Sequence, residues 1–166
     1  GYRVSLAKAA LQQGALSAKL AAPAVLSVNG QTIRLGTVRF NVGGGSLTAT
    51  GSAGQALDVA VDLAALPLSA ANAVAPGLGL AGTLDGTLRI TGPAQSPNAA
   101  FEMKGRGIGA KAIAGFGIRP LTFAASGGYG GKAVQLTRLT ASSPSGLSVT
   151  GKGSLPLSLD GLNFDA

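Results

Sequence analysis

Two pairs of residues in the chain have types and spacings that could support catalysis. Ser5 and Lys8 have the spacing of a serine–lysine nucleophile pair, whose side chains meet when a helix carries them. The segment around them alternates like a strand, so residues three positions apart point to opposite faces. Asp58 and Asp62 have the residue types of an acid–base pair, but on a strand they stand about 13 Å apart, beyond the separation of paired glycosidase carboxylates. We expect neither pair to be catalytic.

Two glycine-rich segments have spacings that resemble phosphate-binding loops. Gly77, Gly79 and Gly82 match the dinucleotide-binding fingerprint, but they follow a predicted helix and precede a predicted strand. That order leaves no helix N-terminus for a phosphate. Residues 127–132 (GGYGGK) lack the first glycine of a P-loop and the hydroxyl residue that follows its lysine. We predict a loop at the first segment and a hairpin turn at the second.

The absence of two residue types further limits the catalytic and metal-binding sites that the chain could form. The 166 residues contain neither His nor Cys, which removes the usual zinc ligands, every thiol nucleophile and the commonest general base near neutral pH. The sequence therefore predicts a protein that is not an enzyme and needs no metal and no cofactor.

The net charge of +7 raises the question of nucleic-acid binding. It comes from 13 Lys and Arg against 6 Asp and Glu, and the basic residues are scattered singly from Arg3 to Lys152. Aromatic residues make up only 4% of the chain, so few can stack on bases. We expect no nucleic-acid partner and interpret the charge as a solvated basic face, compatible with anionic lipid nearby.

Composition favours strands and turns. Hydrophobic residues make up 46% of the chain, charged residues 11%, and there are 27 glycines. No apolar stretch reaches the roughly 18–20 residues that span a bilayer, and the richest one, residues 56–80, contains Asp58 and Asp62. Because the chain begins with Gly and its strand pattern starts at once, we expect residues 1–166 to be one β-rich segment of a longer protein, with any membrane anchor outside it.

Alternation of apolar and polar residues runs along the whole chain, with the period of two that is typical of strands with one buried face. Asn29-Gly30 suits a two-residue hairpin, which would pair segment 24–28 with segment 31–35, and residues 43–45 (GGG) form a second predicted turn. The sequence predicts an all-β fold of about ten to twelve short strands, the clearest over residues 2–6, 16–20, 24–28, 31–35, 38–42, 46–50, 57–63, 84–90, 99–103, 121–125, 133–141 and 147–151.

Only one segment is predicted to be helical. Ser69 can cap a helix over Ala70–Ala75, which Pro76 and Gly77 would end. One short helix cannot cover a large sheet, so its apolar face must be buried by the sheet folding on itself, by a neighbouring domain or by a ligand. The residues predicted to form that face, a candidate groove for lipid or a client strand, are Val38, Phe40, Val42, Leu47, Leu57, Val59, Val61, Leu88, Ile90, Phe101, Met103, Leu121, Phe123, Val134, Leu136, Leu147 and Val149.

A loose internal repeat relates residues 31–69 to residues 121–158. The segment from Gly45 (GSLTATGS) resembles that from Gly146 (GLSVTGKGS), and LPLS occurs at Leu66 and again at Leu155. The two offsets differ, near 100 and 89 residues, so no regular solenoid is implied. The repeat suggests a modular sheet that continues beyond both ends.

The order of motifs over residues 57–159 resembles the C-terminal region of the TamB (translocation and assembly module) family, whose features are shared in part by other AsmA-like, bridge-like envelope proteins. The resemblance is carried by a leucine-proline-leucine, a short helix, a glycine-rich strand and a small residue before proline. These features occur in residues 66–78 (LPLSAANAVAPGL) and 82–98 (GTLDGTLRITGPAQSPN). Similar residue patterns continue over residues 101–104, 121–125 and 146–157.

The resemblance implies a bacterial periplasmic protein anchored to the inner membrane, with an extended, curved sheet, U-shaped or taco-like, and an apolar concave face. It also implies a role in outer-membrane biogenesis, either assembling outer-membrane proteins or moving phospholipid between the membranes. The implied partners are a TamA-like outer-membrane barrel of the Omp85 type, phospholipid acyl chains and nascent outer-membrane protein strands. The alternative function is a structural or adhesive passenger domain of a secreted surface protein, whose core its own side chains would fill.

Overall fold

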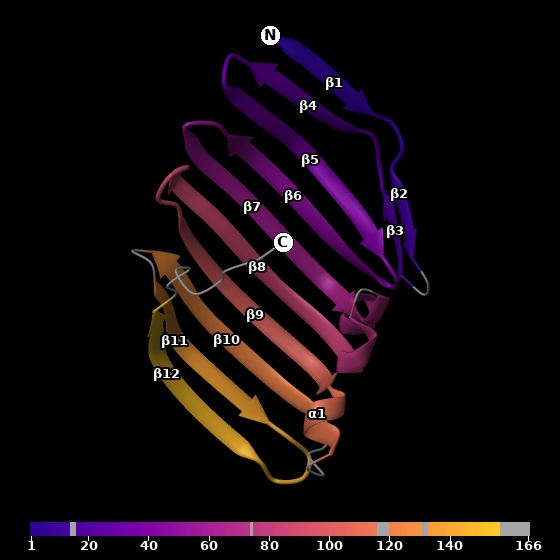
Figure 1. Ribbon diagram of the computed structural model, residues 1–166, viewed down its shortest axis with the longest axis vertical. Coiled ribbons are helices and arrows are strands. Elements are labelled where there is room, and N and C mark those ends of the chain that lie inside the picture. Colours follow the sequence, from indigo (N-terminus) through magenta and orange to yellow (C-terminus); the bar gives the residue numbers. More distant parts are fainter. Residues whose placement is uncertain (14–15, 74, 116–119, 131–132, 157–166) are drawn as a thin grey trace, which may run out of the picture.

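The computed structural model describes residues 1–13, 16–73, 75–115, 120–130 and 133–156. They form one extended, curved all-β sheet of twelve strands that does not close into a barrel (Figure 1). The strands are β1 Tyr2–Leu6, β2 Ala10–Gln13, β3 Leu16–Leu20, β4 Ala24–Asn29, β5 Thr32–Val42, β6 Gly45–Ala53, β7 Ala56–Pro67, β8 Ala81–Pro93, β9 Asn98–Gly109, β10 Leu121–Gly130, β11 Ala133–Ser142 and β12 Ser148–Pro156.

From β4 to β12 the strands follow one another across the sheet in chain order, and every described pair is antiparallel. β1 pairs with β4 and β2 with β3, while β3 and β4 both pair with β5 at different points along its length. β1 with β2, and β3 with β4, therefore act as two interrupted long strands. From β5 to β12 each strand pairs with the next. The result is an up-and-down meander with β1 and β2 at one edge and β12 at the other, as short hairpin connections favour.

The hairpin predicted at Asn29-Gly30 is present, but its loop lies one residue further along. Asn29 pairs with Thr32, so the loop consists of Gly30 and the glutamine after it, and Gly30 has a φ of 59°. This register places Val28 opposite Ile33. The predicted register would have placed Val28 opposite that glutamine, so the observed one gains an apolar cross-strand pair.

Four alternate strands, β5, β7, β9 and β11, each contain a bulge with one extra residue. Because of the extra residue, two residues three positions apart in the chain point to the same face of the sheet, as residues two positions apart do in a regular strand. Ala65, in the bulge of β7, has a φ of 48°. Among the described residues it is the only non-glycine residue with a positive φ. The pairs of residues on either side of the four bulges are Leu35 and Val38, Leu63 and Leu66, Gly105 and Ile108, and Leu136 and Leu139.

The strands are longer than the sequence predicted, because glycines that resemble strand ends lie inside strands. β8 has 13 residues, and β10 continues to Gly130, so most of the hairpin turn predicted at 127–132 is strand. Residues 131–132 of that turn lie outside the described residues. Large side chains of neighbouring strands lie over several of these glycines and replace the missing packing; three such pairs are Gly86 with Met103, Gly105 with Phe123, and Gly127 with Phe101.

We expect Gly127→Ala to lower the melting temperature by about 3–10 °C, the range that follows from overpacking costs of about 1–3 kcal/mol. A Cβ at this position would lie 2.2 Å from the backbone oxygen of Gln135 and 2.9 Å from the ring of Phe101. Gly151→Ala is the matched control, because a Cβ there meets nothing within 4 Å. Thermal melting followed by circular dichroism checks both variants, and equal melting temperatures would contradict the packing of Phe101 over Gly127.

A short helix is present where one was predicted over Ala70–Ala75, but it is a 3₁₀ helix that begins earlier, at Leu68, and residue 74 of the predicted range lies outside the described residues. The structure has two 3₁₀ segments here, η1 Leu68–Ala73 and η2 Pro76–Leu78, and a single turn of α-helix elsewhere, α1 Lys111–Ala114. Six residues are too few for a stable isolated α-helix, and the connection is held by a side chain instead. The Asn72 amide donates to the Leu80 carbonyl (2.8 Å) and accepts from the Leu80 N–H (2.7 Å), which fixes the connection between β7 and β8.

No described element forms a second layer over the sheet. Ala24 and Val38 are the only buried hydrophobic residues in the described part of the chain. The accessible surface of the molecule is 10865 Å², whereas a compact protein of 16.1 kDa exposes about 7,400 Å². The sheet therefore leaves one of its faces without a closed core.

Candidate functional site

The pairing register divides the strand side chains between two faces of the sheet. Residues paired across antiparallel strands share a face, and successive residues alternate between faces. All but one of the residues predicted to form a groove lie together on one side, here called the apolar face: Val38, Phe40, Val42, Leu47, Leu57, Val59, Val61, Leu88, Ile90, Phe101, Met103, Leu121, Phe123, Val134, Leu136 and Val149.

The exception is Leu147, which precedes β12 in the connection from β11 and is 39% exposed. The apolar face also extends beyond the predicted set, because the alternation continues through the bulges and into the N-terminal strands. A step of three between apolar residues was the sequence signal for this extension. The added residues include Tyr2, Val4, Leu6, Leu11, Leu20, Leu26, Val28, Ile33, Leu35, Leu63, Leu66, Leu84, Ile108, Tyr129 and Leu139.

The apolar face is continuous across the strands. One row of paired residues crosses the sheet from β5 to β11, and at about 4.8 Å per strand its length is about 29 Å, close to the thickness of the hydrocarbon core of a bilayer. No charged or hydroxyl side chain of the described residues interrupts the row, which consists of Val38, Ala49, Val61, Leu88, Phe101, Gly127 and Leu136.

The opposite side of the sheet, here called the polar face, contains the charged residues of the described strands. Ser5, Asp58 and Asp62 lie on it, while Lys8 follows β1 outside any strand, so neither candidate catalytic pair is assembled as a nucleophile or an acid–base pair. Asp58 forms an exposed ion pair with Arg89 at 2.8 Å. The charged strand residues are Arg3, Lys19, Arg34, Arg39, Asp58, Asp62, Asp85, Arg89, Glu102, Lys104, Arg106, Arg138 and Lys152.

Asp85 joins three strands on the polar face. The N–H of Ala65, in the bulge of β7, donates to Asp85 Oδ1 at 2.9 Å, and Arg106 of β9 forms an ion pair with Oδ2. The backbone hydrogen bond is the main cause that lowers the pKa of Asp85, and Arg106 and Lys104 lower it further against an opposing effect of desolvation. The carboxylate therefore remains charged and holds the bulge of β7 against β8 and β9.

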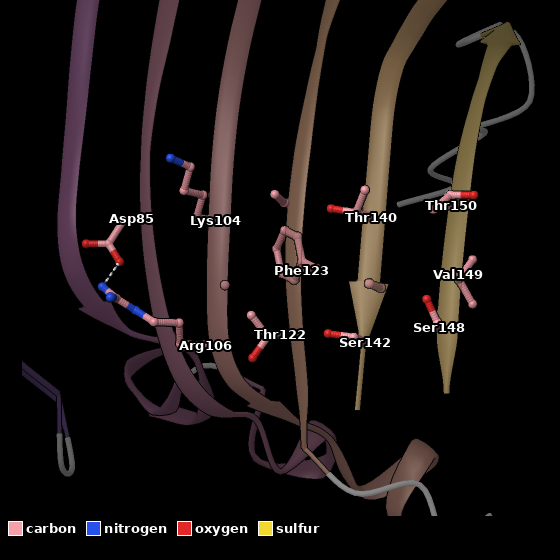
Figure 2. Close-up of a pocket in the computed structure, with 13 residues that line it drawn as sticks. Asp85, Lys104, Arg106, Thr122, Phe123, Thr140, Ser142, Ser148, Val149 and Thr150 are labelled. Carbon is pink, nitrogen blue, oxygen red and sulfur yellow. Dashed lines mark hydrogen bonds and ion pairs between the residues drawn. The ribbon is translucent and has the colours of Figure 1, made fainter. Parts of the chain in front are cut away.

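A hollow of about 580 Å³ lies over β8 to β12, mainly against residues of the polar face, and two residues of the predicted groove, Phe123 and Val149, also line it. Figure 2 shows the Asp85–Arg106 ion pair at one side of the hollow and hydroxyl-bearing side chains of β10, β11 and β12 at the other. Sequence reasoning missed it, because the hollow depends on which strands lie side by side. Its side chains include Asp85, Lys104, Arg106, Thr122, Ala124, Thr140, Ser142, Ser148 and Thr150.

The described residues contain no group of three or more His, Cys, Asp or Glu side chains placed to hold a metal ion. Within the same residues, no helix has the length and apolar character needed to cross a membrane. The side chains of the apolar face can make contacts with other apolar groups. Comparison of the chain with protein-family models, with curated proteins and with solved structures found no match.

Proposed function

We propose that the apolar face is a non-catalytic binding surface for phospholipid acyl chains or for amphipathic strands of unfolded outer-membrane proteins. The observation that carries the proposal is the continuity of this face across an open sheet whose charged strand residues lie on the other side. A surface of this kind offers similar apolar contacts at many positions. It suits a client that passes along it better than a ligand held at one point.

The hydrophobic effect supplies the driving force. A methylene group that leaves water for an apolar surface gains about 0.8 kcal/mol, so a chain lying along the row through Val61 and Leu88 gains several times that amount. Small residues such as Ala49 and Gly127 interrupt the larger side chains of the row. The contacts are therefore spread along the face instead of concentrated in one deep pocket.

The family resemblance adds the cellular setting to the proposal. In a TamB-like protein the surface serves outer-membrane biogenesis in the periplasm, between an inner-membrane anchor and a TamA-like outer-membrane barrel. Its clients are phospholipids that move between the membranes, outer-membrane proteins that await assembly, or both. No nucleotide, metal or other cofactor takes part in this mechanism.

The rival function, a structural or adhesive passenger domain, requires a core filled by the side chains of the protein itself. The described part of the chain has two buried hydrophobic residues, Ala24 and Val38, and Tyr2, Val4 and Leu11 are each more than half exposed. An accessible surface about 3,500 Å² larger than that of a compact protein of this mass also supports an open face. These observations favour the binding surface over the self-filled core.

Native mass spectrometry of the gently purified chain tests the proposal. We expect adducts with the masses of phospholipid or detergent, and we expect a hydrophobic dye to bind the delipidated, folded protein and to be displaced by fatty acid. A monomer that carries no adduct and binds no dye would overturn the proposal and favour a self-filled core.

A further inference from the structure

Three hollows on the polar face adjoin one another and form a trough across β7 to β12. The hollow of about 580 Å³ shares Asp85 and Lys104 with a neighbour of about 280 Å³ towards β7. It shares Thr140 and Thr150 with a neighbour of about 420 Å³ towards β12. Most of the residues that line the three hollows point to the polar face, which places the trough on that side of the sheet.

Small side chains on β10 account for the depth of the trough. Ala124 lies between Lys104 of β9 and Thr140 of β11 in one row of paired residues, and Thr122 precedes it on the same face. Lys104 and Arg106 of β9 are the long side chains on one side of Ala124, and Thr140 of β11 lies on the other. A volume of about 580 Å³ is within the usual range for small-molecule sites, roughly 300–1,000 Å³.

The charge of the trough changes sign along its length. Towards β7 it is lined by Asp62 and Glu102, whereas from β9 to β12 its cations are Lys104, Arg106, Arg138 and Lys152. Two carboxylates lie near these cations: Asp85, which already accepts from Ala65 and pairs with Arg106, and Glu102, two residues before Lys104 on β9. Lys104 lies opposite Asp85 and lowers its pKa, but neither Lys104 nor Arg138 forms an ion pair within 4 Å among the described residues, so both can still contact an anion.

The positions of these groups fit a phosphate. From strand spacing and rise, the Cα atoms of Lys104 and Arg138 are about 12 Å apart, a gap that two long cationic side chains can close from opposite sides. Thr140 offers a hydroxyl donor in the same row as Lys104 and Ala124, and Thr122 offers another two residues before Ala124, on the side away from Arg138. Cations together with hydroxyl donors form the charge-assisted hydrogen bonds that phosphate oxygens accept.

We infer that the part of the trough between β9 and β12 is a binding site for a phosphate ester. Lys104 and Arg138 hold the phosphate above Ala124, and Thr122 and Thr140 donate hydrogen bonds to it. The attached group, a sugar or the glycerol of a lipid headgroup, extends along the remaining hydroxyls towards β12. This site is independent of the apolar face and of its proposed clients.

Isothermal titration of the 166-residue chain tests the site, with inorganic phosphate and glycerol 3-phosphate as soluble probes at constant low ionic strength. We expect saturable binding that Lys104→Gln and Arg138→Gln each weaken about tenfold, because each removes a charge-assisted hydrogen bond. Ala124→Leu changes no charge but fills the floor, and it should weaken binding at least as much. Lys19→Gln and Arg34→Gln, on the same face but outside the trough, are the matched controls.

Vesicles distinguish a membrane lipid from a free phosphate ester as the source of the ligand. Phosphatidylcholine vesicles with and without phosphatidylglycerol are added to the same variants. Binding of the soluble probes and of the anionic vesicles, both reduced by Ala124→Leu, assigns the site to a lipid headgroup, whereas binding of the soluble probes alone assigns it to a free ester. Absence of saturable phosphate binding overturns the inference, as does equal weakening by Lys19→Gln and Lys104→Gln, which would indicate general attraction to a basic face.

Discussion

Val61→Asp is expected to leave the chain folded while reducing its bound phospholipid by at least about tenfold. Val61 lies in the middle of β7, between Ala49 of β6 and Leu88 of β8. On an open face the new carboxylate keeps much of its water, so the sheet still forms. An acyl chain that covers the position must remove that water at a cost of several kcal/mol, and about 1.4 kcal/mol already corresponds to a tenfold loss of affinity.

The neighbouring residue supplies the control for this prediction. Ala60→Asp introduces the same charge one position away, on the polar face between Thr50 and Arg89, and should bind lipid like the unmodified chain. Arg39→Ala, also on the polar face, should do the same. The measurements are thermal melting and phospholipid bound per chain. If Val61→Asp folds and still carries lipid, the binding surface does not include this row, and if it cannot fold, a closed core covers the position.

The sequence contained enough information to predict the two faces of the sheet, because period-two alternation fixes the side on which each strand residue lies. Asp58 and Val59 are adjacent in the chain and fall on opposite faces, as predicted. The bulges were also readable in retrospect. Leu35 and Val38, or Leu136 and Leu139, break the alternation by one residue, and the structure absorbs each break in a bulge that keeps both side chains on the apolar face.

The lengths of the strands were not predictable from local patterns. Gly105 and Gly127 resemble strand ends in the sequence, since isolated glycines weaken strands. In the folded chain Phe123 lies over Gly105 and Phe101 over Gly127, so residues on neighbouring strands replace the packing that each glycine lacks. Such compensation depends on the register between strands, which the sequence of a single strand does not contain.

The trough on the polar face depends on register in the same way. Lys104 and Ala124 lie in separate alternating segments, and nothing in either segment indicates that they are paired across β9 and β10. The hydrogen bond from the Ala65 N–H to Asp85, 20 residues away in the chain, could not be predicted from the alternation either. Alternation assigns residues to faces, whereas the grouping of charged side chains on a face requires the pairing of the strands.

Self-association that amphiphiles reverse is the second large effect expected of an open apolar face. The molecule exposes 10865 Å², about 3,500 Å² more than a compact protein of its mass, and a stable protein–protein interface needs only about 1,200–2,000 Å². In water without lipid or detergent, copies of the chain should therefore bury their apolar faces against one another. Sedimentation velocity should show dimers or larger assemblies at micromolar concentration.

A nonionic detergent above its critical micelle concentration should convert these assemblies to monomers, because detergent chains cover the same surface. Val61→Asp should shift the distribution towards monomer without detergent, since face-to-face packing would bury its carboxylate between two apolar layers. Ala60→Asp should leave the distribution unchanged, because its charge lies on the polar face beside Arg89. A lipid-free chain that remains monomeric, or assemblies that Ala60→Asp disperses as well as Val61→Asp does, would mean that the apolar face is not the surface through which the protein meets other molecules.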